Sequence, residues 1–235
     1  MASSSEYSFG ARLRKAQDMA TFIAGFTAYD PPRSEEQVVN FNVFLSTIVE
    51  CNSTETTYKQ NYNAAVITRY NAFRVDDFSL FKLLAPIRNI VLAQYGKDSI
   101  EFKQVDTIIA KIRSSKLIKT IVGENIVEAS ISQSEQSYGS STQFFNDLVN
   151  TLETFPSYKP SKDELKLDKL KDFRNSLTTL NNAVASNYQK INEVRNKRRV
   201  LYEELTDRTQ RIKAYVKGNY GTLSQEYKLI KGLRI

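Results

Sequence analysis

The segment that decides the fold runs from Leu170 to Leu205 and reads LKDFRNSLTTLNNAVASNYQKINEVRNKRRVLYEEL. Its seam positions recur in strict steps of three and four over five heptads. That period predicts a helix that carries a left-handed coiled-coil seam. The seam consists of Leu170, Phe173, Leu177, Leu180, Val184, Asn187, Ile191, Val194, Arg198, Leu201 and Leu205.

Two spans of the chain contain neither Gly nor Pro, Arg33 to Ala85 and Ser161 to Lys217. Because these two residue types are the main helix breakers, each span is expected to form a long helix. A helix of about 45 residues is about 65 Å long, so we expect an elongated all-α bundle. The first span has a weaker and more polar seam, formed by Phe41, Phe44, Ile48, Cys51, Glu55, Tyr58, Tyr62, Ala65, Arg69 and Ala72.

The two long helices belong to two related halves of the chain. One constant register places Ser3 on Ser132 and Arg69 on Arg198, and a four-residue excess in the first half, near Phe78 to Lys82, changes the register after it. The alignment has 22 identities in 103 positions, where chance would give roughly six. Matched Ser, Glu, Pro and Gly residues in order indicate a tandem duplication rather than similar helical patterning alone.

The duplication divides the chain into a first helical repeat, 1–116, a linking segment, 117–130, and a second, more basic repeat, 131–235. The linking segment is expected to form a strap or a short hairpin. A shorter helix is expected after each long one, from about Phe78 to Gln94 and from about Thr206 to Asn219.

A Tyr-Gly-x-x-Ser-x-Glu motif follows the shorter helix in both repeats. Glycine is expected to serve as the C-terminal cap of that helix and serine as the N-terminal cap of the next. The motif residues are Tyr95, Gly96, Ser99, Glu101, Tyr220, Gly221, Ser224 and Glu226.

The residue counts exclude several kinds of chemistry. Among 235 residues there is no His and only one Cys, Cys51. The chain therefore lacks the commonest general base and metal ligand, and it cannot form an internal disulfide or a cysteine zinc cluster. Phosphate-binding loops and clustered metal-binding carboxylates are also absent from the sequence. We expect no enzymatic activity, no cofactor, no metal site and no catalytic residues.

Two arginines, Arg69 and Arg198, occupy equivalent seam positions in the two repeats. A buried arginine is costly unless it has a partner. Each is therefore expected to meet a carboxylate across the bundle or to line a small anion site, and the structural ion pair is favoured. Asn187, on the same seam, is expected to set the register of the helices.

The positive charge is concentrated in the last third of the chain. Residues 159–235 have 18 Lys+Arg and 9 Asp+Glu, a net of +9, whereas the rest has a net of −2. With interleaved tyrosines, the basic residues could contact nucleic acid or another polyanion. The alternatives are a solvated helix face and a surface that meets another subunit. The candidate contacts are Arg195, Lys197, Arg198, Arg199, Arg208, Arg211, Lys213 and Lys217.

A Ser-x-Ser-Glu-x-Ser-aromatic-Gly motif precedes the first expected helix of each repeat, Gly10 to Thr27 and Ser141 to Thr154. Its hydroxyls are expected to cap that helix, and the alternatives are phosphorylation or an arm that docks on a neighbouring molecule. The candidate docking residues are Ser3, Ser5, Glu6, Gly10, Ser132, Ser134, Glu135 and Gly139.

These features favour a non-enzymatic structural protein that self-associates through helical surfaces into an oligomer, ring or filament. Nucleic-acid or polyanion binding through the basic repeat is the second hypothesis. A helical pore-forming or toxin component is the third, since Phe22 to Phe26 form a short apolar cluster. With no signal sequence or transmembrane segment recognised, a cytoplasmic location is expected, and non-classical export stays open.

Overall fold

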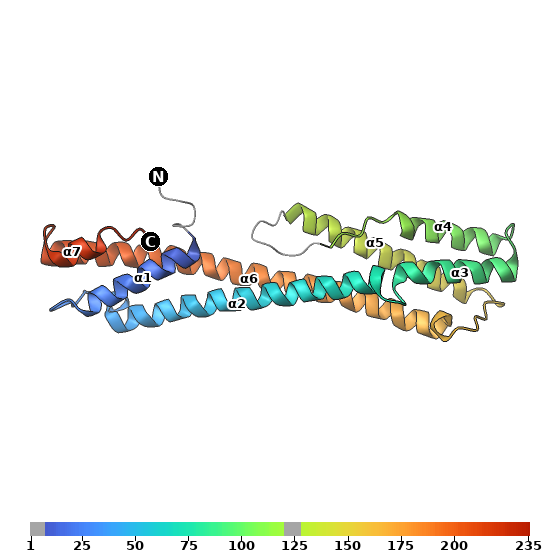
Figure 1. Ribbon diagram of the computed structural model, residues 1–235, viewed down its shortest axis with the longest axis horizontal. Coiled ribbons are helices and arrows are strands. Elements are labelled where there is room, and N and C mark those ends of the chain that lie inside the picture. The colour runs from blue at the N-terminus through green and yellow to red at the C-terminus, as the bar shows by residue number, and fades with distance from the viewer. Residues whose placement is uncertain (1–7, 120–127) are drawn as a thin grey trace. The chain divides into compact units, whose positions relative to one another are not determined.

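The computed structural model describes residues 8–119 and 128–235, and in these residues every regular element is a helix (Figure 1). This confirms the all-α prediction. The α-helices are α1 (Phe9–Ala24), α2 (Val38–Tyr70), α3 (Leu80–Tyr95), α4 (Ile100–Ser114), α5 (Glu128–Glu153), α6 (Leu167–Tyr220) and α7 (Gln225–Ile230). Short 3-10 turns at Ser34–Glu36 and Asp163–Leu165 precede α2 and α6, and a π-helical turn at Asn71–Val75 follows α2.

The chain forms two compact units that do not follow the division into sequence repeats. Unit 1 consists of Met1–Thr57 and Ile191–Ile235, and unit 2 consists of Tyr58–Lys190. Helices α2 and α6 each contribute one part to unit 1 and another to unit 2. Each unit therefore contains residues from both predicted repeats.

Unit 1 is a bundle of α1, the first part of α2, the second part of α6, and α7 (Figure 1). Antiparallel pairing of α2 with α6 follows from two contacts. Glu36, in the turn just before α2, meets Arg211, and Glu55 within α2 meets Arg195. The buried core is mostly aliphatic and aromatic, as expected for helices that bury one face. Its fully buried side chains include Met19, Ile23, Phe41, Ile48, Leu205, Ile212 and Val216.

Unit 2 packs α3, α4 and α5 with the end of α2 and the start of α6 (Figure 1). Its core is larger and richer in leucine. Many of its members occupy the positions that the alignment of the repeats matches with the unit 1 core. They include Leu80, Ile87, Val91, Leu148, Leu152, Leu170 and Leu177.

The predicted Tyr-Gly turns have the expected caps. Gly96 and Gly221 both have positive φ angles, 86° and 94°, which an L side chain rarely adopts. The serine of each motif then caps the next helix. The hydroxyl of Ser99 accepts from the amide of Phe102 at 3.1 Å, and that of Ser224 accepts from the amide of Tyr227 at 3.0 Å.

The long helices differ from the prediction in one respect. In the first repeat the helix ends at Tyr70 and restarts at Leu80, whereas α6 continues without a break to Tyr220, through the separate helix expected near Thr206. In the alignment Val75 matches Glu204 and Leu80 matches Leu205, so the stretch 76–79 has no counterpart. The first predicted repeat therefore has four additional residues at the place where its long helix ends in a π-helical turn and breaks.

The start of the second repeat also differs from the prediction. Helix α5 begins at Glu128 rather than near Ser141, so the stretch from Ser132 to Gly139 lies inside a helix instead of preceding one. Serine and glycine in a helix interior each cost at most about 1 kcal/mol relative to alanine, and burial of the large Tyr138 side chain offsets that cost. Of the predicted strap or hairpin, 120–127 lies outside the described residues and 128–130 is helical.

Candidate functional site: the buried arginines and the basic segment

Arg69 forms a buried ion pair within unit 2. Its guanidinium donates to both carboxylate oxygens of Glu135, Nη1 to Oε2 and Nη2 to Oε1, each at 2.7 Å. Only 1% of the Arg69 side chain is exposed, and its guanidinium carbon lies 3.9 Å from the centre of the Tyr138 ring. Paired and stacked in this way, Arg69 has the environment of a structural ion pair and not of an open anion site.

Arg198, its counterpart, lies in unit 1 and also meets a carboxylate. It pairs with Glu55, and Arg195 approaches the same carboxylate at 3.3 Å. The Glu55 side chain is 3% exposed, so two cations surround one buried anion. The guanidinium carbon of Arg198 lies 4.2 Å from the centre of the Phe9 ring.

The aromatic surroundings of the two arginines correspond in the alignment of the repeats. The register that matches Arg69 with Arg198 also matches Tyr138 with Phe9, the rings that lie against the guanidinium groups. Each ring contacts a second aromatic ring as well. These second rings, Phe73 at 4.9 Å from Tyr138 and Tyr202 at 4.6 Å from Phe9, are again matched.

Of the two carboxylate partners, only Glu135 has an acid at the matched position of the other repeat. Glu55 lies at a position where the second repeat has Val184, and Glu135 lies where the first repeat has Glu6. The two sequence repeats therefore share the aromatic environment of the arginine. Glu55 has no acidic counterpart, and Glu6, the counterpart of Glu135, lies outside the described residues.

Most of the predicted polyanion contacts are engaged within unit 1. Arg211 donates to the buried Glu36 carboxylate at 2.6 Å, and Arg208 donates to the Glu35 carbonyl at 3.1 Å while its guanidinium stacks on Phe44. Arg208 also pairs with Glu204 on its own helix. Together with Arg195 and Arg198, these two arginines join α6 to the first repeat.

The remaining basic residues differ in exposure. The amine of Lys213 donates to the Leu233 carbonyl, and burial lowers the pKa of that amine. Arg199 is exposed and pairs with Glu203 one turn away on the same helix. Lys197 and Lys217 are exposed on α6. Five of the eight candidates therefore have inward contacts, and three lie at the surface of unit 1.

The charge asymmetry of the sequence largely disappears in the folded units. Unit 1 has 15 Lys+Arg and 12 Asp+Glu, a net of +3, and unit 2 has 18 and 14, a net of +4. Each unit combines a part of the basic repeat with a part of the other. The acids of the first repeat, above all Glu36 and Glu55, accept the arginines of the second.

The Tyr-Gly turn residues have structural contacts. The Tyr95 hydroxyl accepts from the amide of Ser157 at 2.9 Å in unit 2, and the Tyr220 hydroxyl donates to the carbonyl of Thr27 at 2.8 Å in unit 1. Both tyrosines also contact a phenylalanine ring, Phe155 and Phe26. Glu101 and Glu226 lie in the first turns of α4 and α7, where a carboxylate is favoured by the helix dipole.

Only part of the predicted docking arms can be described. Ser3, Ser5 and Glu6 lie outside the described residues, and Ser132 and Ser134 lie within α5. Ser8 caps α1 by accepting from the amide of Ala11 at 3.2 Å, as the capping interpretation expects. Gly10 and Gly139 are exposed positions on α1 and α5, and Glu135 is the partner of Arg69.

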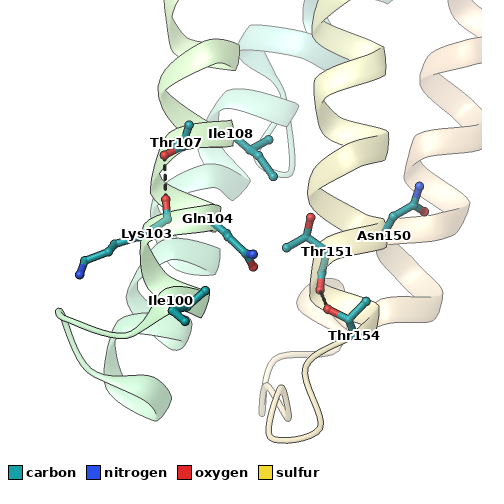
Figure 2. Close-up of a pocket in the computed structure, with 8 residues that line it drawn as sticks. All are labelled: Ile100, Lys103, Gln104, Thr107, Ile108, Asn150, Thr151 and Thr154. Carbon is teal, nitrogen blue, oxygen red and sulfur yellow. Dashed lines mark hydrogen bonds between the residues drawn. The ribbon is translucent and has the colours of Figure 1, made fainter.

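Unit 2 has an open groove of about 740 Å³ between α4 and α5 (Figure 2). Gln104 and Ile108 point from α4 toward α5, while the amine of Lys103 points away from the groove. The hydroxyl of Thr107 donates to the carbonyl of Lys103 at 2.8 Å, and that of Thr154, just after α5, donates to the carbonyl of Thr151 at 2.7 Å. The lining residues are Ile100, Lys103, Gln104, Thr107, Ile108, Asn150, Thr151 and Thr154.

A smaller groove of about 360 Å³ lies at the corresponding place in unit 1, between α1 and α7. Five of its lining positions match those of the first groove in register, yet the residue types differ at every one. Where unit 2 has Asn150 and Thr151, unit 1 has Thr21 and Phe22. The two grooves therefore reflect how a pair of helices packs.

The sequence did not identify Glu36 and Glu55 as structural residues, although both are buried acceptors for arginine. Glu55 had one signal, a carboxylate on an otherwise apolar seam. For Glu36 the sequence indicated only a favourable charge near a helix start.

Across residues 8–119 and 128–235, no group of three or more Cys, Asp or Glu side chains could hold a metal ion. None of the helices described there combines the length and apolar character needed to cross a lipid bilayer. Comparison of the chain with protein-family models, with curated proteins and with solved structures finds no match in any of the three.

Proposed function

We propose that this chain is a non-enzymatic structural protein that self-associates through its helical surfaces. One observation carries the proposal: the buried charged side chains are engaged with one another inside each unit. Arg69 with Glu135, and Arg198 and Arg195 with Glu55, hold helices together. The groups that would have to be free for anion binding or proton transfer therefore serve as cross-links between helices.

Large aliphatic side chains on the surface support an assembly role. Val39, Ile100 and Leu223 are 73%, 72% and 82% exposed. Single exposed apolar residues are common on any protein. Several large ones, two of them on helices and one in the turn before α7, favour a partner that covers them.

We also propose that the two repeats arose by tandem duplication and exchange their halves, so that each unit pairs the first part of one repeat with the second part of the other. Matched contacts support this proposal. The hydroxyl of Tyr29 donates to the carbonyl of Glu36 at 3.0 Å in unit 1. In unit 2 the hydroxyl of Tyr158 donates to the carbonyl of Leu165 at 2.9 Å, and the alignment matches both members of this pair with those of the first.

Nucleic-acid binding stays the second candidate, because five of its eight proposed contacts pair with or donate to other groups of unit 1. Lys197, Arg199 and Lys217 of that set are the exposed ones on α6. Retention of the protein on immobilised heparin or DNA across a salt series separates the two functions. Strong binding with a steep salt dependence would favour the polyanion function.

Light scattering across protein concentration and salt tests the structural function directly. We expect species larger than the 26.9 kDa chain, in amounts that rise with concentration and persist at high salt, because apolar contacts are not screened. A chain that stays monomeric throughout would overturn the proposal.

A further inference from the structure

The exposed face of α2 in unit 1 is almost free of charge. Within Val38–Thr57 ten residues are exposed, and Glu50 is the only charged one. The others are Val39, Asn40, Asn42, Val43, Ser46, Val49, Ser53, Thr56 and Thr57. We call seven of these residues, which share one side of the helix between Val39 and Ser53, the α2 face: Val39, Asn42, Val43, Ser46, Val49, Glu50 and Ser53.

Helix α6 in the same unit provides the comparison. Between Ile191 and Tyr220 it has twelve exposed residues, and six of them are charged: Glu193, Lys197, Arg199, Glu203, Asp207 and Lys217. The two helices pack against each other and belong to one bundle, so a difference in local solvation does not explain the contrast. Loss of charged residues is what distinguishes the centre of a protein interface from ordinary surface.

Exposed apolar side chains on the α2 face provide a driving force for association. Val39, Val43 and Val49 are 73%, 62% and 45% exposed. Ser46 lies between Val43 and Val49 on the helix surface, and its small side chain allows a second helix to approach closely. Burial of the three valines would remove apolar surface from water without desolvating a charge.

We propose that the α2 face binds the α2 face of a second copy of this chain, antiparallel, about a two-fold axis at Ser46. This inference rests on the proposed function and names its surface. If a partner placed charged side chains on this face, those side chains would lose their hydration. Glu50 is the only charge on the α2 face that could compensate them, and only where they are positive. The same face of another copy is almost uncharged, has the same length and is always present at equal concentration.

The register of the α2 face is self-complementary about Ser46. A two-fold axis there places Val43 opposite Val49, and Val39 opposite Ser53. It places Glu50 opposite Asn42, whose side-chain amide can donate to the carboxylate. The two Glu50 side chains are then separated by about 12 Å along the helix, which avoids a like-charge contact. Contact centred on one helix face is small for a stable dimer, so we expect association in the micromolar to millimolar range.

Substitution of one valine by lysine tests the surface. Val43→Lys introduces a charge into the α2 face, and Val200→Lys introduces the same charge on α6, at a valine that is 54% exposed. In sedimentation equilibrium, Val43→Lys is expected to raise the dissociation constant at least about tenfold, and Val200→Lys to change it less than about twofold. Both valines are exposed, so circular dichroism should find both variants folded.

Cysteine cross-linking tests the register, in a Cys51→Ala background that removes the buried native thiol. Ser46→Cys on the axis should form a disulfide-linked dimer under mild oxidation. Ser53→Cys should not, because the two copies of that position lie about 21 Å apart along the helix axis. Cross-linking at both positions, or at Ser53→Cys alone, would overturn the antiparallel register.

The outcomes separate the inference from the proposed function. Self-association that survives Val43→Lys unchanged would overturn the α2 face while leaving the structural function intact. A wild-type chain that is monomeric at every concentration would overturn both.

Discussion

Arg69 and Glu135 form a two-pronged ion pair between α2 and α5, with both N–H···O distances at 2.7 Å. The arginine is almost completely buried, and Tyr138 covers one face of its guanidinium. A buried guanidinium without its carboxylate would be strongly destabilising, so the pair fixes which face of α5 meets α2.

Removal of the carboxylate should therefore destabilise the fold. We expect Glu135→Ala to lower the free energy of unfolding by about 2 to 4 kcal/mol, because it leaves the buried Arg69 guanidinium without a counter-charge. Urea denaturation followed by circular dichroism measures the change.

The exposed pair Arg14 and Asp18 provides the control, at 3.3 Å within α1. Asp18→Ala is expected to change stability by no more than about 0.5 kcal/mol. The double variant Arg69→Met, Glu135→Leu should recover most of the loss, since apolar side chains of similar volume can replace a buried pair. Equal effects of Glu135→Ala and Asp18→Ala would contradict the structural role of the pair.

The helical nature of the fold could be predicted because it depends on local signals. The absence of Gly and Pro from Ser161 to Lys217 predicted a long helix, and α6 covers Leu167–Tyr220. Caps at Ser99 and Ser224 could also be predicted, since a cap depends only on its neighbouring residues.

The partners of the seam arginines could not be predicted, because they depend on which parts of the chain come together. Arg198 pairs with Glu55 of the other repeat, and Arg69 pairs with Glu135, which was expected to lie in an arm before the helix. The division of the chain into two units, each with residues from both predicted repeats, has no local signal either. For this reason the charge of the last third suggested an external partner, whereas its arginines meet acids of the same chain.

Two matched tyrosines test the proposed duplication. Tyr29 and Tyr158 each donate a hydrogen bond to the carbonyl at the matched position later in the chain. Tyr29→Phe and Tyr158→Phe should each lower the free energy of unfolding by about 1 kcal/mol, because each leaves one carbonyl without its donor. Tyr58→Phe, on the partly exposed side of α2, serves as the control for the loss of a hydroxyl. If one of the two matched variants lost much of its free energy of unfolding and the other lost none, Tyr29 and Tyr158 would not have equivalent roles.

The glycines of the Tyr-Gly turns should not tolerate a side chain. Gly96→Ala and Gly221→Ala place a Cβ on backbone with positive φ and should each cost about 1 kcal/mol. Gly139→Ala, in the interior of α5 with open space around it, should instead stabilise by about 0.5 to 1 kcal/mol. Thermal denaturation measures all three, and a stabilised Gly96→Ala would contradict the conformation of the turn.

Stability should fall at alkaline pH because of buried tyrosines. Burial raises the pKa of Tyr62 and of Tyr138 to about 12, whereas in the unfolded chain these groups lose their protons near pH 10. Between those pH values unfolding releases protons, so the free energy of unfolding decreases as pH rises. The stabilising contribution is complete below about pH 10 and is lost as pH rises through about 12.

Phenylalanine variants isolate this pH effect. The hydroxyls of Tyr62 and Tyr138 are buried and make no hydrogen bond within the described part of the chain, so Tyr62→Phe and Tyr138→Phe should retain the stability of the wild type at neutral pH. Above about pH 10 each should flatten the decline in the urea midpoint. A decline as steep as that of the wild type would rule out these tyrosines as its source.

Sedimentation velocity across protein concentration, at physiological and at high salt, tests whether this chain assembles with copies of itself as proposed. We predict a shift from the 26.9 kDa monomer to larger species as concentration rises, retained at high salt and reduced by Val43→Lys but not by Val200→Lys. A single monomeric boundary at every concentration and salt would contradict self-assembly.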